Sequence, residues 1–180
     1  RIQEFIDQLS NWYVRRSRRR FWKSENDADK LSAYISLYSC LETVARLMAP
    51  LAPFVAEQLY QTLVKGVEAG APDSVHLAEF PVDDDSLVDE PLMEATRLAM
   101  RISSMGRSAR SKAGLRVRQP LASMMVKTRS PQELGYLELI RPQVLEELNI
   151  KELHGLEDDS SIYRQALEAA GDQTEATLSV

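Results

Sequence analysis

Helical periodicity is the feature that most limits how this sequence can fold. Over residues 2–23, apolar side chains recur at intervals of three and four, which places them on one face of an amphipathic helix. Similar spacing continues along most of the chain, and prolines and glycines separate the periodic stretches. The pattern predicts helices over residues 2–23, 28–49, 53–64, 89–112 and 131–148. Among the side chains expected to face the core are Leu31, Tyr34, Ile35 and Phe54.

Two short apolar segments have the pattern of strands rather than helices. Residues 121–128 lie between turn-forming residues, and residues 150–156 follow the last long helix. Together with the helix at 131–148 they predict a strand–helix–strand unit. The irregular connection at 66–91 contains one further candidate for an extended piece, at 74–77.

The predicted fold class is mainly α, a helical bundle followed by a small α+β (strand–helix–strand) appendage. We assign the bundle to residues 1–114 and the appendage to residues 115–156. Residues 157–180 form an acidic tail, which we expect to be poorly ordered apart from helical periodicity at 162–170.

Basic residues are concentrated in two places, although the net charge is −5. Six of the nine residues at 15–23 are basic, and residues 97–129 contain nine basic residues and no acidic one. Residues 130–180 hold three basic and eleven acidic residues. Because salt screens charges beyond about 8–10 Å, the local clusters matter more than the total, and they predict contact with phosphate groups.

The sequence lacks the motifs of a catalytic or metal centre. Its one cysteine, Cys40, excludes an internal disulfide and is typical of a reducing compartment. Cys40, His76 and His154 do not have the spacing of metal ligands, and there is no glycine-rich phosphate loop. No apolar run reaches the ~20 residues of a membrane span. We therefore predict no catalytic residue, no metal site and no membrane segment.

Residues 9–22 place arginines beside aromatic rings, a combination that suits RNA phosphates and bases. Trp12 and Tyr13 lie on or beside the apolar face, which favours a place in the core over base stacking. The alternative for the arginines is that they are solvated or paired with Glu25, Asp27 or Asp29.

The segment LSNWYVRRSRRRFW at 9–22 is similar to a signature of isoleucyl-tRNA synthetase, a class I aminoacyl-tRNA synthetase, in its eukaryote-like branch. Further resemblances follow in the family's order over residues 2–156. They are AYISLYSCL at 33–41, APLAPF at 49–54, SVHL at 74–77, FP at 80–81, LRVRQPL at 115–121 and LNIKE at 148–152. The APLAPF and RQPL elements also resemble valyl and leucyl relatives.

The resemblance implies an anticodon-binding domain with the start of a C-terminal extension, and it implies that the family's first bundle helix is missing. The parent would be an ATP-dependent isoleucine–tRNA ligase of the cytoplasm with ATP and zinc as cofactors, and this fragment would lack its catalytic core. The implied partners are the anticodon stem-loop of the isoleucine tRNA and the remainder of the synthetase chain.

The candidate tRNA contacts are basic residues in two sets, one on the first helix and one at the end of the fourth helix and its exit. We expect the two sets to converge into a cleft that accepts folded RNA. Arg118 has an equally strong alternative role, which is to hold the turn at 118–121. The candidates are Arg15, Arg16, Arg19, Lys23, Arg107, Arg110, Lys112, Arg116 and Arg118.

Two other functions remain open from the sequence. One is the anticodon-binding domain of a valyl- or leucyl-tRNA synthetase. The other is a helical protein-interaction module that binds a partner helix through an apolar groove, which the acidic residues at 130–180 would also suit.

Overall fold

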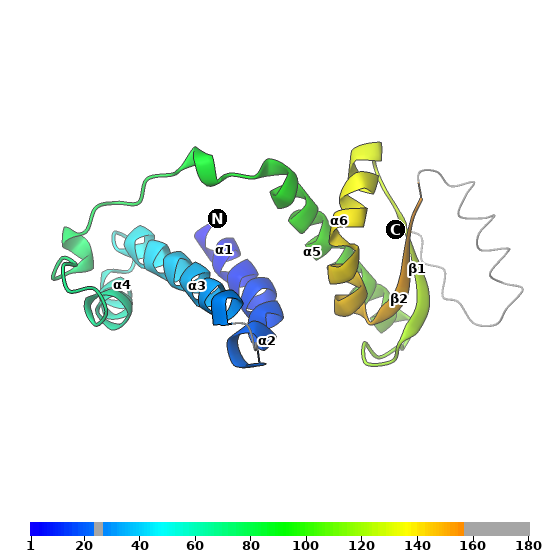
Figure 1. Ribbon diagram of the computed structural model, residues 1–180, viewed down its shortest axis with the longest axis horizontal. Coiled ribbons are helices and arrows are strands. Elements are labelled where there is room, and N and C mark those ends of the chain that lie inside the picture. Colours follow the sequence, from blue (N-terminus) through cyan, green and yellow to red (C-terminus); the bar gives the residue numbers. More distant parts are fainter. Residues whose placement is uncertain (24–26, 157–180) are drawn as a thin grey trace, which may run out of the picture. The chain divides into compact units, whose positions relative to one another are not determined.

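A computed structural model describes residues 1–23 and 27–156, which form two compact units divided between residues 85 and 86. The predicted fold class is confirmed, because the described part is mainly helical and contains a two-stranded sheet (Figure 1). The domain limit predicted at residue 114 stays a prediction, and the predicted acidic tail lies outside the described residues.

The first unit consists of helices α1 (Ile2–Gln8), α2 (Arg15–Lys23), α3 (Asp27–Met48) and α4 (Pro53–Tyr60). Wider π-helical turns at Leu9–Val14 and Gln61–Lys65 continue α1 and α4, so that the predicted helices are continuous but not uniform. α3 contacts both α2 and α4 (Figure 1). Pro53 occupies the first turn of α4, where its missing N–H costs nothing.

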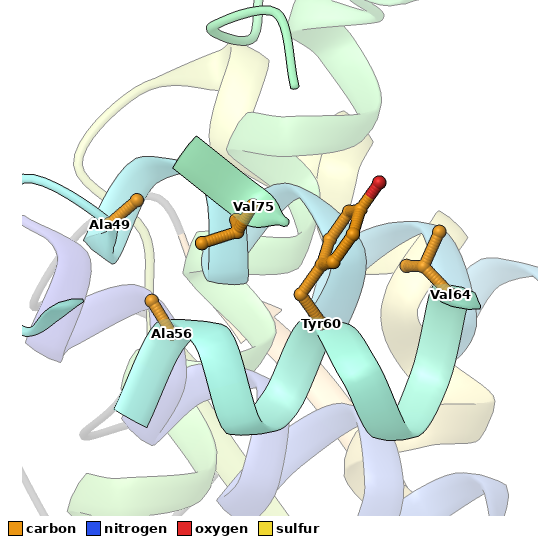
Figure 2. Packing of buried hydrophobic residues seen from close by; sticks show 5 residues of the cluster. All are labelled: Ala49, Ala56, Tyr60, Val64 and Val75. Carbon is orange, nitrogen blue, oxygen red and sulfur yellow. The ribbon is translucent and has the colours of Figure 1, made fainter. Parts of the chain in front are cut away.

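A buried apolar cluster joins the end of α3 to α4 and to the segment that follows. It consists of Ala49, Ala56, Tyr60, Val64 and Val75 (Figure 2). Val75 lies in a 3₁₀ turn at Val75–Leu77, so the prediction of an extended piece at 74–77 is wrong. The turn forms because the Ser74 hydroxyl accepts a hydrogen bond from the amide of His76.

Four apolar side chains predicted to face the core are exposed instead. Leu31, Tyr34 and Ile35 are 60%, 47% and 55% exposed, and Phe54 is 89% exposed. The reason is that α3 is buried on the face that carries Ala33, Val44 and Ala45, and helical periodicity does not say which apolar face is covered.

The second unit contains α5 (Glu90–Lys112), β1 (Leu121–Lys127), α6 (Pro131–Leu148) and β2 (Ile150–Leu156). These elements agree closely with the prediction. β1 and β2 are parallel, with Leu121 opposite Ile150 and Lys127 opposite Leu156. A parallel pair needs a crossover connection, and α6 provides it.

α6 packs against both α5 and the sheet, and glycines permit the close approach on each side. The Leu148 side chain occupies the space where a Cβ of Gly106 on α5 would lie, and the Leu134 and Leu137 side chains do the same at Gly155 on β2. In the described part of the chain, no helix is long and apolar enough to cross a membrane.

Candidate nucleic-acid interface

The outward face of α2 is a row of cations that ends in an aromatic ring. Arg15, Arg18, Arg19 and Trp22 are all exposed, and their spacing of three and four residues places them on one side of the helix. Trp22 is 70% exposed, which is unusual for a side chain that gains so much from burial. This face extends about 10 Å along the helix axis, the length of about three stacked bases.

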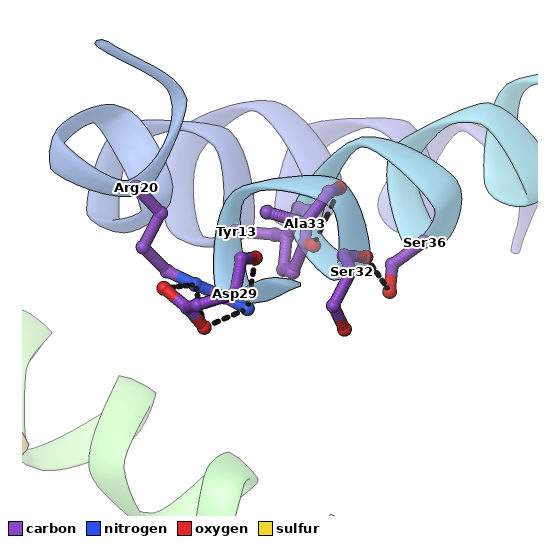
Figure 3. A network of polar contacts seen from close by, with 6 residues as sticks. All are labelled: Tyr13, Arg20, Asp29, Ser32, Ala33 and Ser36. Atoms are coloured by element: carbon purple, nitrogen blue, oxygen red, sulfur yellow. Dashed lines mark hydrogen bonds and ion pairs between the residues drawn. The ribbon is translucent and has the colours of Figure 1, made fainter. Parts of the chain in front are cut away.

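The opposite side of α2 is fixed to α3 by packing and by hydrogen bonds. The ring centroids of Phe21, which is buried, and Tyr34 are 5.0 Å apart. The Arg20 guanidinium donates from Nε to both carboxylate oxygens of Asp29 at 3.0 Å, and these bonds raise the pKa of Arg20 (Figure 3). The expectation that some arginines of this cluster are paired is therefore confirmed for Arg20.

The four candidates predicted on the first helix have different surroundings. Arg15 donates from Nε to the carbonyl oxygen of Asn11 at 2.8 Å, and the Arg16 guanidinium lies 5.2 Å from the ring centroid of Trp12. Arg19 is exposed and has no hydrogen bond or ion pair within residues 1–23 and 27–156. Lys23 is the last residue of α2.

Two residues of this face were missed by the sequence prediction. Arg18 has the same exposure as Arg19 and likewise no partner among the described residues, and Trp22 ends the row. The i, i+3, i+4, i+7 spacing that starts at Arg15 could have identified both residues, because it places them on the same side of the helix as Arg15. Trp12 and Tyr13 are half-buried, and the Tyr13 hydroxyl donates to the carbonyl of Ala33 at 3.1 Å (Figure 3).

The second basic set belongs to the turn that follows α5. Gly114 has a positive φ of 69° and ends the helix, and the Leu115 amide donates back to the carbonyl of Arg110 at 2.8 Å. At the last residue of α5 and in the turn beyond Gly114, the chain exposes three cations that have no side-chain partner among the residues the structure describes. These are Lys112, Arg116 and Arg118.

Arg107 and Arg110, which were predicted in the same set, are both bonded to oxygen atoms of the protein, and Arg110 is also buried. The Arg107 Nη1 lies 2.9 Å from a carboxylate oxygen of Glu147, whose side chain is only 5% exposed. Arg110 is 3% exposed and donates from Nη2 to the carbonyl of Arg116 at 2.6 Å. Both guanidinium groups are thus engaged by protein oxygens, and we leave them out of the surface set.

The two basic sets lie in different units of the chain, α2 in the first and the turn at 112–118 in the second. Their convergence into one cleft therefore stays a prediction. Within the described residues, no three His, Cys, Asp or Glu side chains are grouped so that they could hold a metal ion.

Comparison with known proteins relates this chain to the tRNA ligases. Three of the similar proteins are named isoleucine–tRNA ligase. The one from Dehalococcoides mccartyi strain CBDB1 is 60% identical over 90% of this chain and 16% of its own length. Those from Clostridium acetobutylicum and Thermus thermophilus are 46% and 43% identical, over 84% and 89% of this chain and 14% and 16% of their own lengths.

The chain thus spans less than a fifth of the length of these relatives. The family model described as the anticodon-binding domain of tRNA ligase matches residues 1–125, which include both surface sets of basic residues. The chain belongs to the family of anticodon-binding domains of tRNA ligases.

Proposed function

We propose that this chain is part of an isoleucine–tRNA ligase and binds the anticodon stem-loop of the isoleucine tRNA during ATP-dependent aminoacylation. The family match and the names of the relatives support the proposal. ATP binding and the ligase reaction would belong to the remainder of the enzyme, which also makes that remainder a partner of this chain. The location is then the cytoplasm, and membership of the eukaryote-like branch stays a prediction.

Zinc, which the sequence resemblance implies for the parent enzyme, has no role here that the residues support. The described part contains no suitable group of ligands. We propose that zinc, like ATP, belongs to the remainder of the enzyme and that this chain contributes recognition of the tRNA.

The proposed recognition uses the outward face of α2 for both phosphates and a base. Guanidinium groups form strong charge-assisted hydrogen bonds with phosphate oxygens, and Arg18 and Arg19 are exposed without protein partners in the described structure. Trp22 offers its ring to an unstacked base of the loop. The observation that carries the proposal is this pair of available arginines beside an exposed tryptophan, in a member of this family.

The second unit would contribute phosphate contacts from Lys112, Arg116 and Arg118. Lys112 ends α5, and Arg116 and Arg118 lie in the exposed turn that follows, so the three cations are arranged around a bend of the chain rather than along one helix. Contacts of this kind fix the position of the RNA, while the bases carry the sequence information.

Filter binding of the 180-residue chain to isoleucine tRNA over a series of salt concentrations tests the proposal. We expect Arg19→Gln to weaken binding and to lower the slope of log K against log salt by about 1. Arg97→Gln is the matched control, because Arg97 is an exposed helical arginine that pairs with Glu94. Equal effects of Arg19→Gln and the control would contradict the proposed face.

Competition between tRNAs tests the choice of amino acid. We expect isoleucine tRNA to compete better than valine or leucine tRNA. The reverse order would instead indicate that the chain is part of a valyl- or leucyl-tRNA synthetase. A chain that binds no tRNA at low salt would instead favour the protein-interaction module, for which Leu31 and Ile35 already supply exposed apolar surface.

A further inference from the structure

Four consecutive carbonyl groups in the turn after α5 are all bound by two side chains from elsewhere in the second unit. Arg110 Nη2 donates to the carbonyls of Arg116, at 2.6 Å, and of Gln119. Asn149 Nδ2 donates to the carbonyls between them, Val117 at 3.2 Å and Arg118 at 3.0 Å. The backbone of residues 116–119 is therefore held by two side chains, Arg110 at the outer two carbonyls and Asn149 at the inner two.

The Arg110 guanidinium has no other compensation for its charge in the described structure. It is 3% exposed, forms no ion pair with a described residue, and its Nε and Nη1 have no hydrogen-bond partner there. A guanidinium stays charged when buried, and a buried charge without partners is strongly unfavourable. The carbonyl oxygens of Arg116 and Gln119 are thus the groups of the turn that stabilise this charge.

Asn149 is the residue that links the turn to the rest of the unit. It ends α6 with a left-handed backbone, φ 51°, a conformation that Asn adopts more readily than most residues. Its carbonyl accepts the amide of Leu121, the first residue of β1, at 3.1 Å. One residue therefore fixes the end of a helix, the start of a strand and the middle of the turn.

The turn whose carbonyls are bound in this way also carries two cationic side chains. Arg116 and Arg118 are exposed and have no protein partner within the described residues. We propose that Arg110 and Asn149 are positioning residues that hold the turn at 116–119 in the form in which Arg116 and Arg118 bind RNA phosphates. Ligand groups held in place before binding lose less conformational entropy when the complex forms, which raises affinity.

This inference rests on the proposed tRNA function, and Asn149→Gly is the variant that isolates it. Glycine accepts the left-handed backbone at residue 149 and preserves the helix end, while it removes the two hydrogen bonds from the Asn149 side chain to the turn. We expect the 180-residue chain with this substitution to bind isoleucine tRNA about tenfold more weakly, with its melting temperature nearly unchanged. Arg110→Gln, if it folds, should act in the same direction, and Arg110→Lys should restore part of the affinity.

A double-mutant cycle distinguishes positioning from general damage. In a chain that already carries Arg116→Gln and Arg118→Gln, we expect Asn149→Gly to change affinity by less than about twofold. Arg101→Gln is the control for a lost arginine on α5, since Arg101 pairs with Glu133 at 2.6 Å and has no hydrogen bond to the turn among the described residues. Its effect should be the same in both backgrounds. An Asn149→Gly effect of equal size in both backgrounds would overturn the inference.

Amide hydrogen exchange supplies a readout that does not depend on RNA. We expect Asn149→Gly to speed exchange at residues 116–119 and to leave the amides of α5 unchanged. Unchanged exchange in the turn would contradict the holding role even if affinity fell. A wild-type chain that binds no tRNA would overturn the proposed function itself. RNA would then also be excluded as the ligand of the turn. This outcome would be seen before any variant is made.

Discussion

At the scale of single residues, Trp22 gives the sharpest expectation for base recognition. Its ring is 70% exposed and meets Phe21 edge-on, with the ring centroids 6.1 Å apart. Because the ring is already exposed, a base can stack on it without first displacing it from the core. We expect Trp22→Ala to weaken binding of isoleucine tRNA by about 1–3 kcal/mol, the range measured for base–aromatic stacking. Trp22→Phe should lose less.

Fluorescence provides the measurement and the control for this prediction. We expect tRNA to quench the emission of the wild-type chain, and most of the quenching to disappear in Trp22→Phe. Trp12→Phe is the matched control, because Trp12 is half-buried beneath the Arg16 guanidinium. Quenching that is lost in Trp12→Phe instead would show that the base lies elsewhere.

The candidate site could be predicted from the sequence only in part, and the arginines show why. Clustering of charge located both basic segments, and Arg19 and Arg116 are exposed as a ligand-binding residue must be. Arg110, equally basic in the sequence, is buried and donates to carbonyl groups of the turn that follows α5. The same turn is bound by Asn149, which lies 39 positions beyond Arg110 in the chain, and no local sequence pattern predicts such a contact.

At the scale of elements, two glycines in the second unit make a matched pair. Gly106 lies in α5 where the buried side chain of Leu148 fills the space of a Cβ, whereas Gly135 in α6 has no neighbouring atom there. We expect Gly106→Ala to lower the free energy of unfolding by about 1–3 kcal/mol through overpacking. We expect Gly135→Ala to raise it by about 0.5–1 kcal/mol, because alanine loses less backbone entropy in a helix.

Urea denaturation followed by circular dichroism measures both changes. If Gly106→Ala proved as stable as the wild-type chain, α5 and α6 could not be as closely packed as the structure has them. If Gly135→Ala were destabilising, its side of α6 would have to be covered by something outside the described residues.

Acid should loosen the attachment of the 3₁₀ turn at Val75–Leu77 to α4. The Glu57 carboxylate accepts hydrogen bonds from Gln61, Ser74 and the amide of Val75, at 2.9, 2.8 and 3.0 Å. These bonds, that of Gln61 foremost, lower the pKa of Glu57 below its ordinary value of 4.5. A lowered pKa means that the carboxylate stabilises the fold above pH 4.5 and that this contribution is lost as the pH falls through the folded-state pKa.

We therefore expect the melting temperature of the wild-type chain to exceed that of Glu57→Gln at neutral pH, and the difference to shrink below pH 4.5. Glu79→Gln is the control for a lost carboxylate, since Glu79 is exposed and its carboxylate has no described partner. A difference that did not depend on pH would assign the role of Glu57 to its shape rather than to its charge.

The limits of helices and strands were easier to predict from the sequence than which of their faces are buried. The helix at 131–148 and the strand at 150–156 have the predicted limits, because Ser130 and Pro131 begin the helix and Asn149 ends it with a left-handed backbone. Periodicity could not predict that Leu31 and Ile35 are exposed, since it identifies an apolar face without identifying a partner. Periodicity also did not predict the π-helical turn at Leu9–Val14.

At the scale of the whole molecule, each of the two units carries one of the proposed RNA-binding surfaces. The outward face of α2 belongs to residues 1–85, and the turn with Arg116 and Arg118 belongs to residues 86–180. Two surfaces on one chain bind one ligand more tightly than either alone, because the second contact forms at the high effective concentration that the connection sets. If both surfaces bind the same tRNA, as we propose, a change in the connection between the units near Asp85 and Ser86 alters the affinity without altering a contact.

We expect cleavage at a protease site inserted between residues 85 and 86 to weaken binding of isoleucine tRNA by about 10²–10⁴, although each half keeps its helical circular dichroism. A flexible Gly-Ser insertion at the same place, left uncut, should weaken it far less, because effective concentration falls slowly as a flexible connection lengthens. Arg116→Gln should lose its effect on the affinity of the α2-containing half after cleavage. If the cut chain bound tRNA as tightly as the intact one, a single unit would be sufficient for binding, and the other basic surface would have no part in it.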